Sequence, residues 1–383
     1  MKIVIAPDSF KENLTSMQVA EAIERGIKRV VPKARCIKIP MADGGEGTVQ
    51  SLVDATGGRI LRKQVTGPLG HPVKARFGML GDGQTAVIEM AEASGLPLVP
   101  KDRRDPLAAT TYGTGELILA ALALGARDII VGIGGSATVD GGTGMAQALG
   151  VRFLDAQGNP ITECGAGGLL SRIAAIDMSG IDARLRTCKL VIAGDVENPL
   201  YGPKGAAAVF GPQKGATPEM VKTLDAGLKQ LAALIKRDLK RDISKTTGGG
   251  AAGGLGAGLM AFAGADMQRG VDLVVAATGL VKHLRGADLV ITGEGRVDFQ
   301  TAFGKTPSGV AKAAHKRKVP VVAIGGALAD DAVGVYAHGI DGLAAGAART
   351  MDLAEALRLS PLHLANAAER VMRLILIGKG MRR

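Results

Sequence analysis

The chain has 383 residues, of which 46% are hydrophobic and 22% charged, and its formal net charge is +11. This length and composition indicate a folded protein large enough for two domains and exclude an intrinsically disordered chain. With no Trp, three Tyr and seven Phe, the chain lacks the aromatic side chains on which proteins stack single-stranded nucleic acid. We therefore interpret the positive charge as a solvated basic surface and predict no nucleic-acid partner.

The three cysteines, Cys36, Cys164 and Cys188, are far apart and odd in number. They fit neither a disulfide framework nor a CxxC metal site, which is typical of a protein in a reducing cytoplasm. The N-terminus enters a strand pattern directly, without the apolar region of a signal peptide. No apolar run approaches the roughly 18 residues of a membrane-spanning helix, so we predict a cytoplasmic protein with no membrane partner.

Short apolar runs bounded by Gly, Asp or Pro alternate with helical patterns along the chain, which predicts a parallel sheet with helical connections. The predicted strands are 3–6, 36–39, 129–132, 190–193, 289–292, 319–324 and, with a weaker pattern, 342–345.

Two helices have clear start signals. Thr15 and Gln18 fit a capping box before an apolar stripe, and Pro32 ends that helix. A second helix is predicted from Pro218, with Thr217 as its N-cap. We interpret the apolar stripes of both helices as core.

The segment 59–91 has a different pattern. Apolar and polar residues alternate over 73–79, and Asp82-Gly83 marks a turn before 85–90, which predicts a β-hairpin. A hairpin inside a chain of alternating strands and helices indicates that a second domain interrupts the first.

We therefore predict an α/β fold with a Rossmann-like (flavodoxin-like) parallel-sheet domain of residues 1–62 and 275–383. A second, mixed α/β domain of residues 63–274 is predicted to interrupt it. The Gly/Ala-rich segment 245–264 fits a linker, a closely packed helix of small residues or a ligand loop, and the sequence leaves these three alternatives open.

Acidic or glycine-rich segments follow several of the predicted strands. In open α/β sheets, ligands bind at the carboxyl ends of the strands. The segments found there are Asp8-Ser9-Phe10-Lys11, Asp43-Gly44-Gly45-Glu46-Gly47, Gly134-Gly135-Ser136 with Asp140, Asp195 with Asn198, and Gly293-Glu294-Gly295-Arg296 with Asp298.

A lone acid at a strand end is usually a helix cap, but several acids with Lys and Arg beside glycine loops indicate phosphoryl transfer. Glycine N–H groups bind phosphates, carboxylates hold Mg²⁺ or accept a proton, and cations offset the transferred charge.

Formal motifs add little to this interpretation. The segment 132–137 fits the GxGxxA dinucleotide pattern, but 81–86 and 256–261 fit it too, as expected by chance in a chain with 56 glycines. Gly304-Lys305-Thr306 looks like the end of a P-loop, but Phe299 occupies the position of the first glycine. The five histidines show neither metal-ligand spacing nor a local catalytic motif.

A series of longer motifs runs through the chain in order. It includes APDSFK (6–11), PMADGGEGT (40–48), VTGPLG (65–70), YGTGELI (112–118), IGGSAT (133–138), VFGPQKGA (209–216) and ITGEGR (291–296). This series resembles the glycerate kinase family from end to end.

The resemblance implies an enzyme that uses ATP and Mg²⁺ to convert D-glycerate into phosphoglycerate, usually the 2-phosphate. It also implies a Rossmann-like domain with a second α/β domain. Two positions depart from the family pattern: Val139 stands where Asn is expected, and Ala193-Gly194 precedes Asp195 where a Cys is expected. These departures bear on rate or affinity more than on the class of reaction.

For the kinase hypothesis, we predict catalytic roles for four residues. Lys11 and Arg296 are predicted to hold the carboxylate of glycerate or the transferred phosphoryl group. Asp195 or Asp298 is predicted to act as the base. Asp195 ends a strongly apolar strand pattern, and Asn198 lies close enough in sequence to share a metal or substrate oxygen with it.

Other residues are predicted to bind nucleotide, substrate or metal. The ATP phosphates are predicted to lie on Gly134, Gly135 and Ser136 and on Gly293 and Gly295, with Asp140 and Glu294 as Mg²⁺ ligands. The remaining predicted binding residues are Asp8, Ser9, Asp43, Gly44, Gly45, Asn198 and Lys305.

Two other functions stay open at this stage. A nicotinamide-dependent oxidoreductase would use the 132–137 loop, and a non-catalytic protein would bind a partner through its basic surface. For each candidate residue the alternative role is turn or cap chemistry. We expect a small-molecule substrate, and a homodimer is compatible with the sequence.

Overall fold

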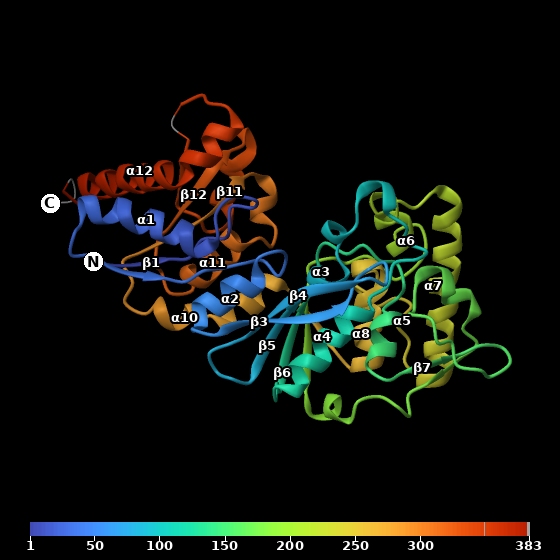
Figure 1. The fold of residues 1–383 in the computed structure, drawn as a ribbon. Helices are drawn as coiled ribbons and strands as arrows, with labels where there is room; N and C mark the ends of the chain where they lie inside the picture. Colours follow the sequence, from blue (N-terminus) through green and yellow to red (C-terminus); the bar gives the residue numbers. More distant parts are fainter. Residues whose placement is uncertain (348, 381–383) are drawn as a thin grey trace. The chain divides into compact units, whose positions relative to one another are not determined.

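The computed structural model describes residues 1–347 and 349–380, which form two compact units (Figure 1). Unit 1 contains Met1–Asp43, Gln50–Gly57 and the chain from Val271 onward, and unit 2 contains Gly44–Val49 and Gly58–Gly270. The domain boundaries predicted at 62/63 and 274/275 stay a prediction, and each unit is described by itself.

Unit 1 is built on a five-stranded parallel sheet. Its strands are β1 (Lys2–Ile5), β2 (Arg35–Lys38), β11 (Leu289–Val297), β12 (Val321–Leu328) and β13 (Gly342–Ala345), in the spatial order β13-β12-β11-β1-β2. Counted in chain order, these five strands have the flavodoxin-like arrangement 2-1-3-4-5, whose switch point lies between β1 and β11. The predicted α/β fold with a parallel sheet is confirmed.

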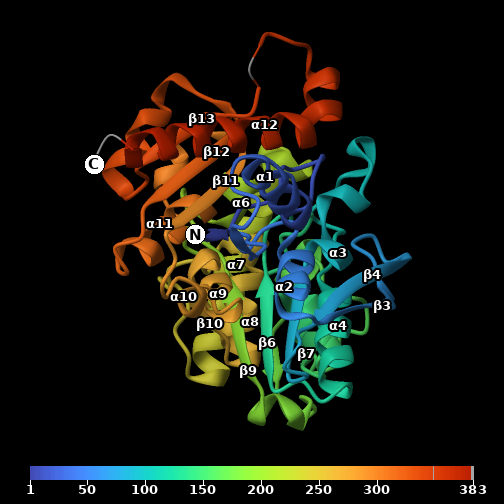
Figure 2. The same cartoon turned by 90° about the vertical axis from the view of Figure 1, so that its left-hand side faces the viewer.

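Two long helices of unit 1 lie side by side, α1 (Ser16–Val30) and α12 (Leu353–Gly380) (Figures 1 and 2). Their buried side chains form one cluster with those of β1 and β11. The capping box of α1 is confirmed, because the backbone N–H of Gln18 donates to Thr15 Oγ1 and the Gln18 side chain accepts from the N–H of Thr15. The other helices of this unit are α2 (Thr48–Thr56), α9 (Gly270–Ala277), α10 (Leu280–His283) and α11 (Thr306–His315).

Unit 2 contains a mixed six-stranded sheet in the order β10-β9-β6-β5-β4-β3. Its strands are β3 (Arg59–Thr66), β4 (Pro72–Met79), β5 (Thr85–Glu89), β6 (Asp128–Gly132), β9 (Lys189–Ala193) and β10 (Asp266–Gln268). Strands β5, β6, β9 and β10 are parallel, whereas β3, β4 and β5 are antiparallel.

The hairpin predicted in this region is therefore confirmed. The carboxylate of Asp82 accepts the backbone N–H groups of Gln84 and Thr85 and so stabilises its turn. Strand β3 extends the hairpin by one strand that the sequence pattern did not identify.

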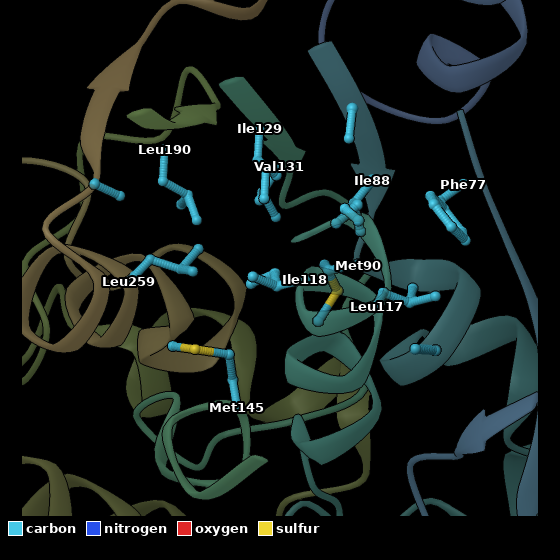
Figure 3. Close-up of a cluster of buried hydrophobic side chains, with 14 of the residues drawn as sticks. Phe77, Ile88, Met90, Leu117, Ile118, Ile129, Val131, Met145, Leu190 and Leu259 are labelled. Atoms are coloured by element: carbon cyan, nitrogen blue, oxygen red, sulfur yellow. The ribbon is translucent and has the colours of Figure 1, made fainter. Parts of the chain in front are cut away.

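The core of unit 2 lies between the strands and a layer of helices (Figure 3). Ile88 of β5 and Val131 of β6 face Ile118 and Met145 from the helices. The helices of this unit are α3 (Ala91–Ser94), α4 (Tyr112–Ala123), α5 (Thr143–Ala148), α6 (Ala206–Phe210), α7 (Pro218–Leu239) and α8 (Leu255–Ala263), and β7 (Arg152–Leu154) pairs with β8 (Ala175–Asp177) in a small separate sheet. The start predicted for α7 is confirmed, with Thr217 as its N-cap.

Of the three alternatives for segment 245–264, the structure shows a helix of small residues, α8, preceded by a short 3₁₀ turn. Glycine is required in α8 by close packing, because a Cβ atom at Gly258 would lie 2.6 Å from the carbonyl oxygen of Gly141. Within residues 1–347 and 349–380, no helix combines the length and hydropathy that crossing a membrane requires.

Candidate active site

Unit 1 has a pocket with a cavity volume of about 580 Å³. Its lining comes from the segments after β1, β2 and β13, from the carboxyl-terminal halves of β11 and β12 with the loop after β11, and from the start of α12. The pocket therefore includes the switch point between β1 and β11, where open α/β sheets bind their ligands. The predicted site residues that the structure brings together here are Asp8, Ser9, Lys11, Asp43, Glu294, Gly295, Arg296, Asp298 and Lys305.

Asp8 is the most perturbed acid of this pocket. Its side chain is only 8% exposed and accepts hydrogen bonds from the backbone N–H of Ser9 and from Thr306 Oγ1. Burial raises the pKa of Asp8 to about 7, and repulsion from Asp43 and Glu294 adds to the rise, while the Thr306 hydrogen bond opposes it. A carboxyl with a pKa near 7 is suited to exchange a proton at neutral pH.

Glu294 and Asp298 are connected through Lys305. Lys305 Nζ lies 3.4 Å from Glu294 Oε2 and 3.7 Å from Asp298 Oδ1, and Thr301 Oγ1 donates to Glu294 Oε1 at 2.6 Å. Burial raises the pKa of Glu294, and the hydrogen bond from Thr301 and the charge of Lys305 oppose this. Asp298 also accepts the N–H of Gln300 as the cap of a 3₁₀ turn, so it has the cap role that the sequence left as an alternative.

Two basic side chains of the pocket are unengaged. Lys11 and Arg296 are both exposed, and neither makes a hydrogen bond or ion pair within the part of the chain that the structure describes. Arg349, by contrast, is paired with Glu355. Exposed cations without partners at the edge of an acidic pocket are available to an anionic ligand.

The other predicted site residues lie in unit 2, at the carboxyl ends of its parallel strands. A Cβ atom at Gly132 would lie 2.7 Å from the carbonyl oxygen of Gly44, and one at Gly44 would lie 3.2 Å from the Cβ of Ala193. The loop of Gly44 and Gly45 therefore contacts the ends of β6 and β9, where glycine is required by close approach of the backbones.

The turn after β6 exposes Gly134 and Gly135 above buried residues. Gly135 has a φ of +72°, which glycine adopts without strain. Among the described residues, the N–H groups of Gly134 and Gly135 donate to no acceptor. Ser136, which follows, is buried and accepts a hydrogen bond from Lys214 Nζ at 2.6 Å.

Asp140 is fully buried and engaged by protein donors. Its carboxylate accepts hydrogen bonds from the N–H and hydroxyl of Thr111 and from the N–H groups of Gly142 and Gly144. Burial raises its pKa, and these hydrogen bonds oppose the rise. This is the geometry of a residue that stabilises a turn, and the predicted role of Asp140 as a Mg²⁺ ligand stays a prediction.

Asp195 is exposed at the end of β9, with Arg269 Nε 3.7 Å from its Oδ1. The side-chain amide of Asn198 donates to the carbonyl oxygen of Lys204. That engagement is turn chemistry, which the sequence left as the alternative to a shared oxygen for Asn198. In unit 1, Gly293 has a packing role, since a Cβ atom there would lie 2.1 Å from the carbonyl oxygen of Ile324 on the next strand.

Sequence reasoning missed several residues of these clusters. Thr306 lay in a segment set aside because it is not a P-loop. Glu89 ends β5 and accepts the N–H of Val49 at the start of α2, and the strand-end rule that selected the other acids could have selected it. Lys214 lies in the motif VFGPQKGA (209–216), but nothing in the sequence marks its burial, which arises only from tertiary packing.

The donor chemistry of the unit 1 pocket fits Mg²⁺. Among the described residues, no group of three or more His, Cys, Asp or Glu side chains has the arrangement of a metal site. In phosphoryl transfer, however, Mg²⁺ is usually held by one or two carboxylates together with phosphate oxygens. The mutual repulsion of Asp8, Asp43 and Glu294 is what a bound divalent cation would relieve.

Comparison with known proteins identifies the family of this chain. The family model described as "Glycerate kinase family" matches residues 3–376. The chain belongs to the glycerate kinase family. This membership confirms the predicted family and enzyme class, a phosphotransferase, and it favours the kinase hypothesis over the oxidoreductase and the binding protein.

Similar relatives cover nearly the whole length of this family member. A glycerate kinase of Bacillus subtilis is 58% identical over 90% of this chain and 89% of its own. A glycerate 2-kinase of Escherichia coli is 50% identical over 99% of both chains. A crystal structure described as a candidate glycerate kinase 2 from Salmonella typhimurium LT2 is 51% identical, with a TM-score of 0.90 over 99% of both chains, which confirms the fold.

Proposed function

We propose that this chain transfers the γ-phosphoryl group of ATP to a hydroxyl of D-glycerate and forms 2-phosphoglycerate. The observation that carries the proposal is the unit 1 pocket, in which Lys11 and Arg296, free among the described residues, accompany a cluster of acids that includes the buried Asp8. The name of the Escherichia coli relative, glycerate 2-kinase, supports the 2-phosphate over the 3-phosphate.

Glycerate is a small anion, and the exposed cations suit it. Arg296 can bind its carboxylate with two parallel hydrogen bonds, and Lys11 adds a second positive charge. The same two side chains can instead offset charge on the transferred phosphoryl group. The assignment to glycerate is preferred because Lys11 lies in the same strand-end segment as Asp8, three residues after it.

Asp43 and Glu294 are the side chains that would hold Mg²⁺ in this pocket. When bound, the ion supplies neutralisation of the phosphate charge during transfer. Lys305, which contacts Glu294, keeps positive charge at the same place. The carboxylates otherwise repel an incoming phosphate, so a cation beside them is required for an anionic substrate to approach.

A carboxylate base would accept the proton of the glycerate hydroxyl. Asp8 is favoured over the sequence candidates Asp298 and Asp195, because its pKa of about 7 matches the working pH of a general base. Asp298 is engaged as a cap, and Asp195 interacts with Arg269. Both stay alternative bases that substitution can test.

In unit 2, we propose that the turn of Gly134 and Gly135 binds a phosphate of the nucleotide. The N–H groups of Gly134 and Gly135, which have no acceptor among the described residues, are successive backbone donors of the kind that can bind an anion. The cytoplasmic location and the homodimer expected from the sequence stay predictions.

A direct assay tests the proposed function. The protein is incubated with ATP, D-glycerate and MgCl₂, ADP release is followed, and the product is identified by ³¹P NMR against 2- and 3-phosphoglycerate. We expect ADP and 2-phosphoglycerate in equal amounts. No glycerate-dependent ADP release would overturn the proposal, and reduction of NAD(P)⁺ in a parallel reaction would favour the oxidoreductase.

A further inference from the structure

Lys214 is buried to an unusual degree for a lysine. Its side chain lies in unit 2 at the end of a 3₁₀ turn (Pro212–Lys214) and is only 2% exposed. Among the described residues, it is the one basic residue in the buried class. Lysine is almost never fully buried unless it is paired, so its place in the fold requires an explanation.

The surroundings of Lys214 do not provide a full ion pair. Its Nζ donates to Ser136 Oγ at 2.6 Å and to the carbonyl oxygen of Thr138 at 2.7 Å. Asp140 attracts the ammonium electrostatically, but its oxygens are engaged by Thr111 and by backbone N–H groups. Burial lowers the pKa of Lys214 to about 7, against the pull of Asp140, so the buried charge is costly.

The polar groups around Lys214 also include one whose hydrogen-bonding capacity is not satisfied. Thr138 is fully buried, and its Oγ1 has no hydrogen-bond partner among the described residues. A polar network that served stability alone would have every member bonded or would be replaced by apolar packing. This cluster has neither property, which is typical of a functional site.

The two acceptors of Lys214, on Ser136 and Thr138, closely follow the exposed Gly134 and Gly135 in the chain. Backbone hydrogen bonds with residues 94–96 hold this segment from one side, through Leu96 N–H to Gly135 and Ala137 N–H to Ser94. Lys214 is the charged side chain that holds it at Ser136 and Thr138. In its protonated form the ammonium also places positive charge next to Ser136, which follows the turn.

We propose that Lys214 is a positioning residue for nucleotide binding, which fixes Ser136 and Thr138 so that the N–H groups of Gly134 and Gly135 stay directed at a phosphate. This inference rests on the proposed use of ATP. Lys214 acts through the turn, because its Nζ is already engaged by two protein acceptors and is buried away from solvent.

Binding of ADP, measured by titration calorimetry, tests the inference without turnover. Lys214→Met keeps the length of the side chain and removes its charge and donors. We expect it to weaken ADP binding by about 10- to 100-fold, the usual effect of losing a charged hydrogen bond, and to raise the KM for ATP while the KM for glycerate changes less than about threefold. Lys214→Gln, which keeps N–H donors without the charge, is expected to give an intermediate ADP affinity.

Ile235→Ala is the matched control, since Ile235 is fully buried in the apolar core of the same unit and has no polar side-chain group that could bond Ser136 or Thr138. It is expected to lower thermal stability and to leave ADP affinity unchanged. Ser136→Ala combined with Lys214→Met completes a double-mutant cycle, and a non-additive loss of ADP affinity would support action through Ser136.

The outcomes separate this inference from the proposed function. Wild-type ADP affinity in folded Lys214→Met or Lys214→Gln would overturn the positioning role and leave the kinase proposal standing. An equal loss in Ile235→Ala would show that destabilisation alone explains the effect and would overturn the role too. If the wild-type protein binds ADP but does not phosphorylate glycerate, the substrate proposal fails while Lys214 is still tested.

Discussion

The pocket of unit 1 and the glycine turn of unit 2 show two ways in which the edge of a sheet can present groups that bind anions. In unit 1, charged side chains dominate, with Lys11 and Arg296 exposed and Asp8 and Glu294 largely buried. In unit 2, the exposed part of the turn is the backbone of two glycines, and Lys214, which donates to Ser136 after the turn, is buried. The first arrangement can recognise charge at several points, whereas the second can recognise the shape of a phosphate.

The two regions also differ in how much the fold stabilises them. Ser136, Asp140 and Lys214 are held in a network of hydrogen bonds in unit 2, which limits how far the turn can adjust. Exposed Lys11 and Arg296 make no such bonds in the described chain and can reorient around a ligand. We therefore expect substitutions in unit 1 to change the chemistry most, and substitutions in unit 2 to change binding or stability.

Metal removal is expected to have the largest effect. With EDTA in excess over all divalent cations, glycerate-dependent ADP release should fall to background, because the acids of unit 1 repel the phosphates of ATP in the absence of a cation. Adding MgCl₂ back should restore the rate. Full turnover in metal-free buffer would contradict the role proposed for Asp43 and Glu294.

Substitution of the proposed base, Asp8, is expected to have the second-largest effect. Asp8→Asn should lower kcat by about 10²–10⁴-fold, the usual contribution of a positioned general base, with ADP binding retained. Asp298→Asn and Asp195→Asn are the matched variants. If Asp195→Asn shows the larger loss of kcat, the base lies in unit 2. Substitutions in unit 2, and not those in unit 1, would then change the chemistry most.

The pH dependence of kcat/KM, which reports the pKa values of the free enzyme, sharpens the same point. A base must be unprotonated, and burial together with the neighbouring acids raises the pKa of Asp8 to about 7. The value of kcat/KM should therefore rise with pH up to about 7 and level off above it, with a decrease of about tenfold per pH unit on the acidic side. A plateau that extends unchanged to pH 5 would exclude Asp8 as the base.

Lys11→Ala is expected to have a smaller and more selective effect. The KM for glycerate should increase by about 10- to 100-fold, because a charged hydrogen bond to the carboxylate is lost, while the affinity for ADP stays nearly unchanged. Lys33→Ala removes an exposed lysine that lies outside the pocket lining and should have no effect on either constant. Loss of ADP affinity with an unchanged glycerate KM would place Lys11 on the nucleotide instead.

Removing one helix cap in each unit is expected to have the smallest effect. Thr15→Ala in unit 1 and Thr217→Ala in unit 2 should each lower the free energy of unfolding by about 1 kcal/mol, measured by urea denaturation. If the two units unfold in separate transitions, each substitution should shift only its own transition. A single transition shifted equally by both would show that the units unfold together.

Much of the fold was predictable because its signals are local. Alternation of apolar strands and helices indicated the parallel sheets, and the cap residues Thr15 and Thr217 marked the starts of α1 and α7. Strand β3 was missed because its burial is incomplete along most of its length, so its apolar pattern is weak. The sequence did not decide among the three alternatives for segment 245–264, because small residues give no distinctive helical periodicity.

The candidate site was predicted in part for the same reason. The strand-end rule selected Asp8, Lys11 and Glu294 because the carboxyl ends of parallel strands meet at one edge of a sheet. The same rule also selected Asp140, which the fold uses to stabilise a turn. A rule based on position along a strand cannot show which oxygens are already engaged by protein donors.

The sequence by itself determined the family, the order of the strand and helix patterns, and the residue types at the strand ends, because these depend on residues near one another along the chain. Only the tertiary structure decided which acids are buried together and which cations stay free. Lys214 lies 78 residues from its acceptor Ser136, and Thr306 lies 298 residues from Asp8. Contacts over such separations depend on the packing of whole units, and burial and neighbouring charge, which set the protonation of Asp8 and Lys214, exist only once that packing is complete.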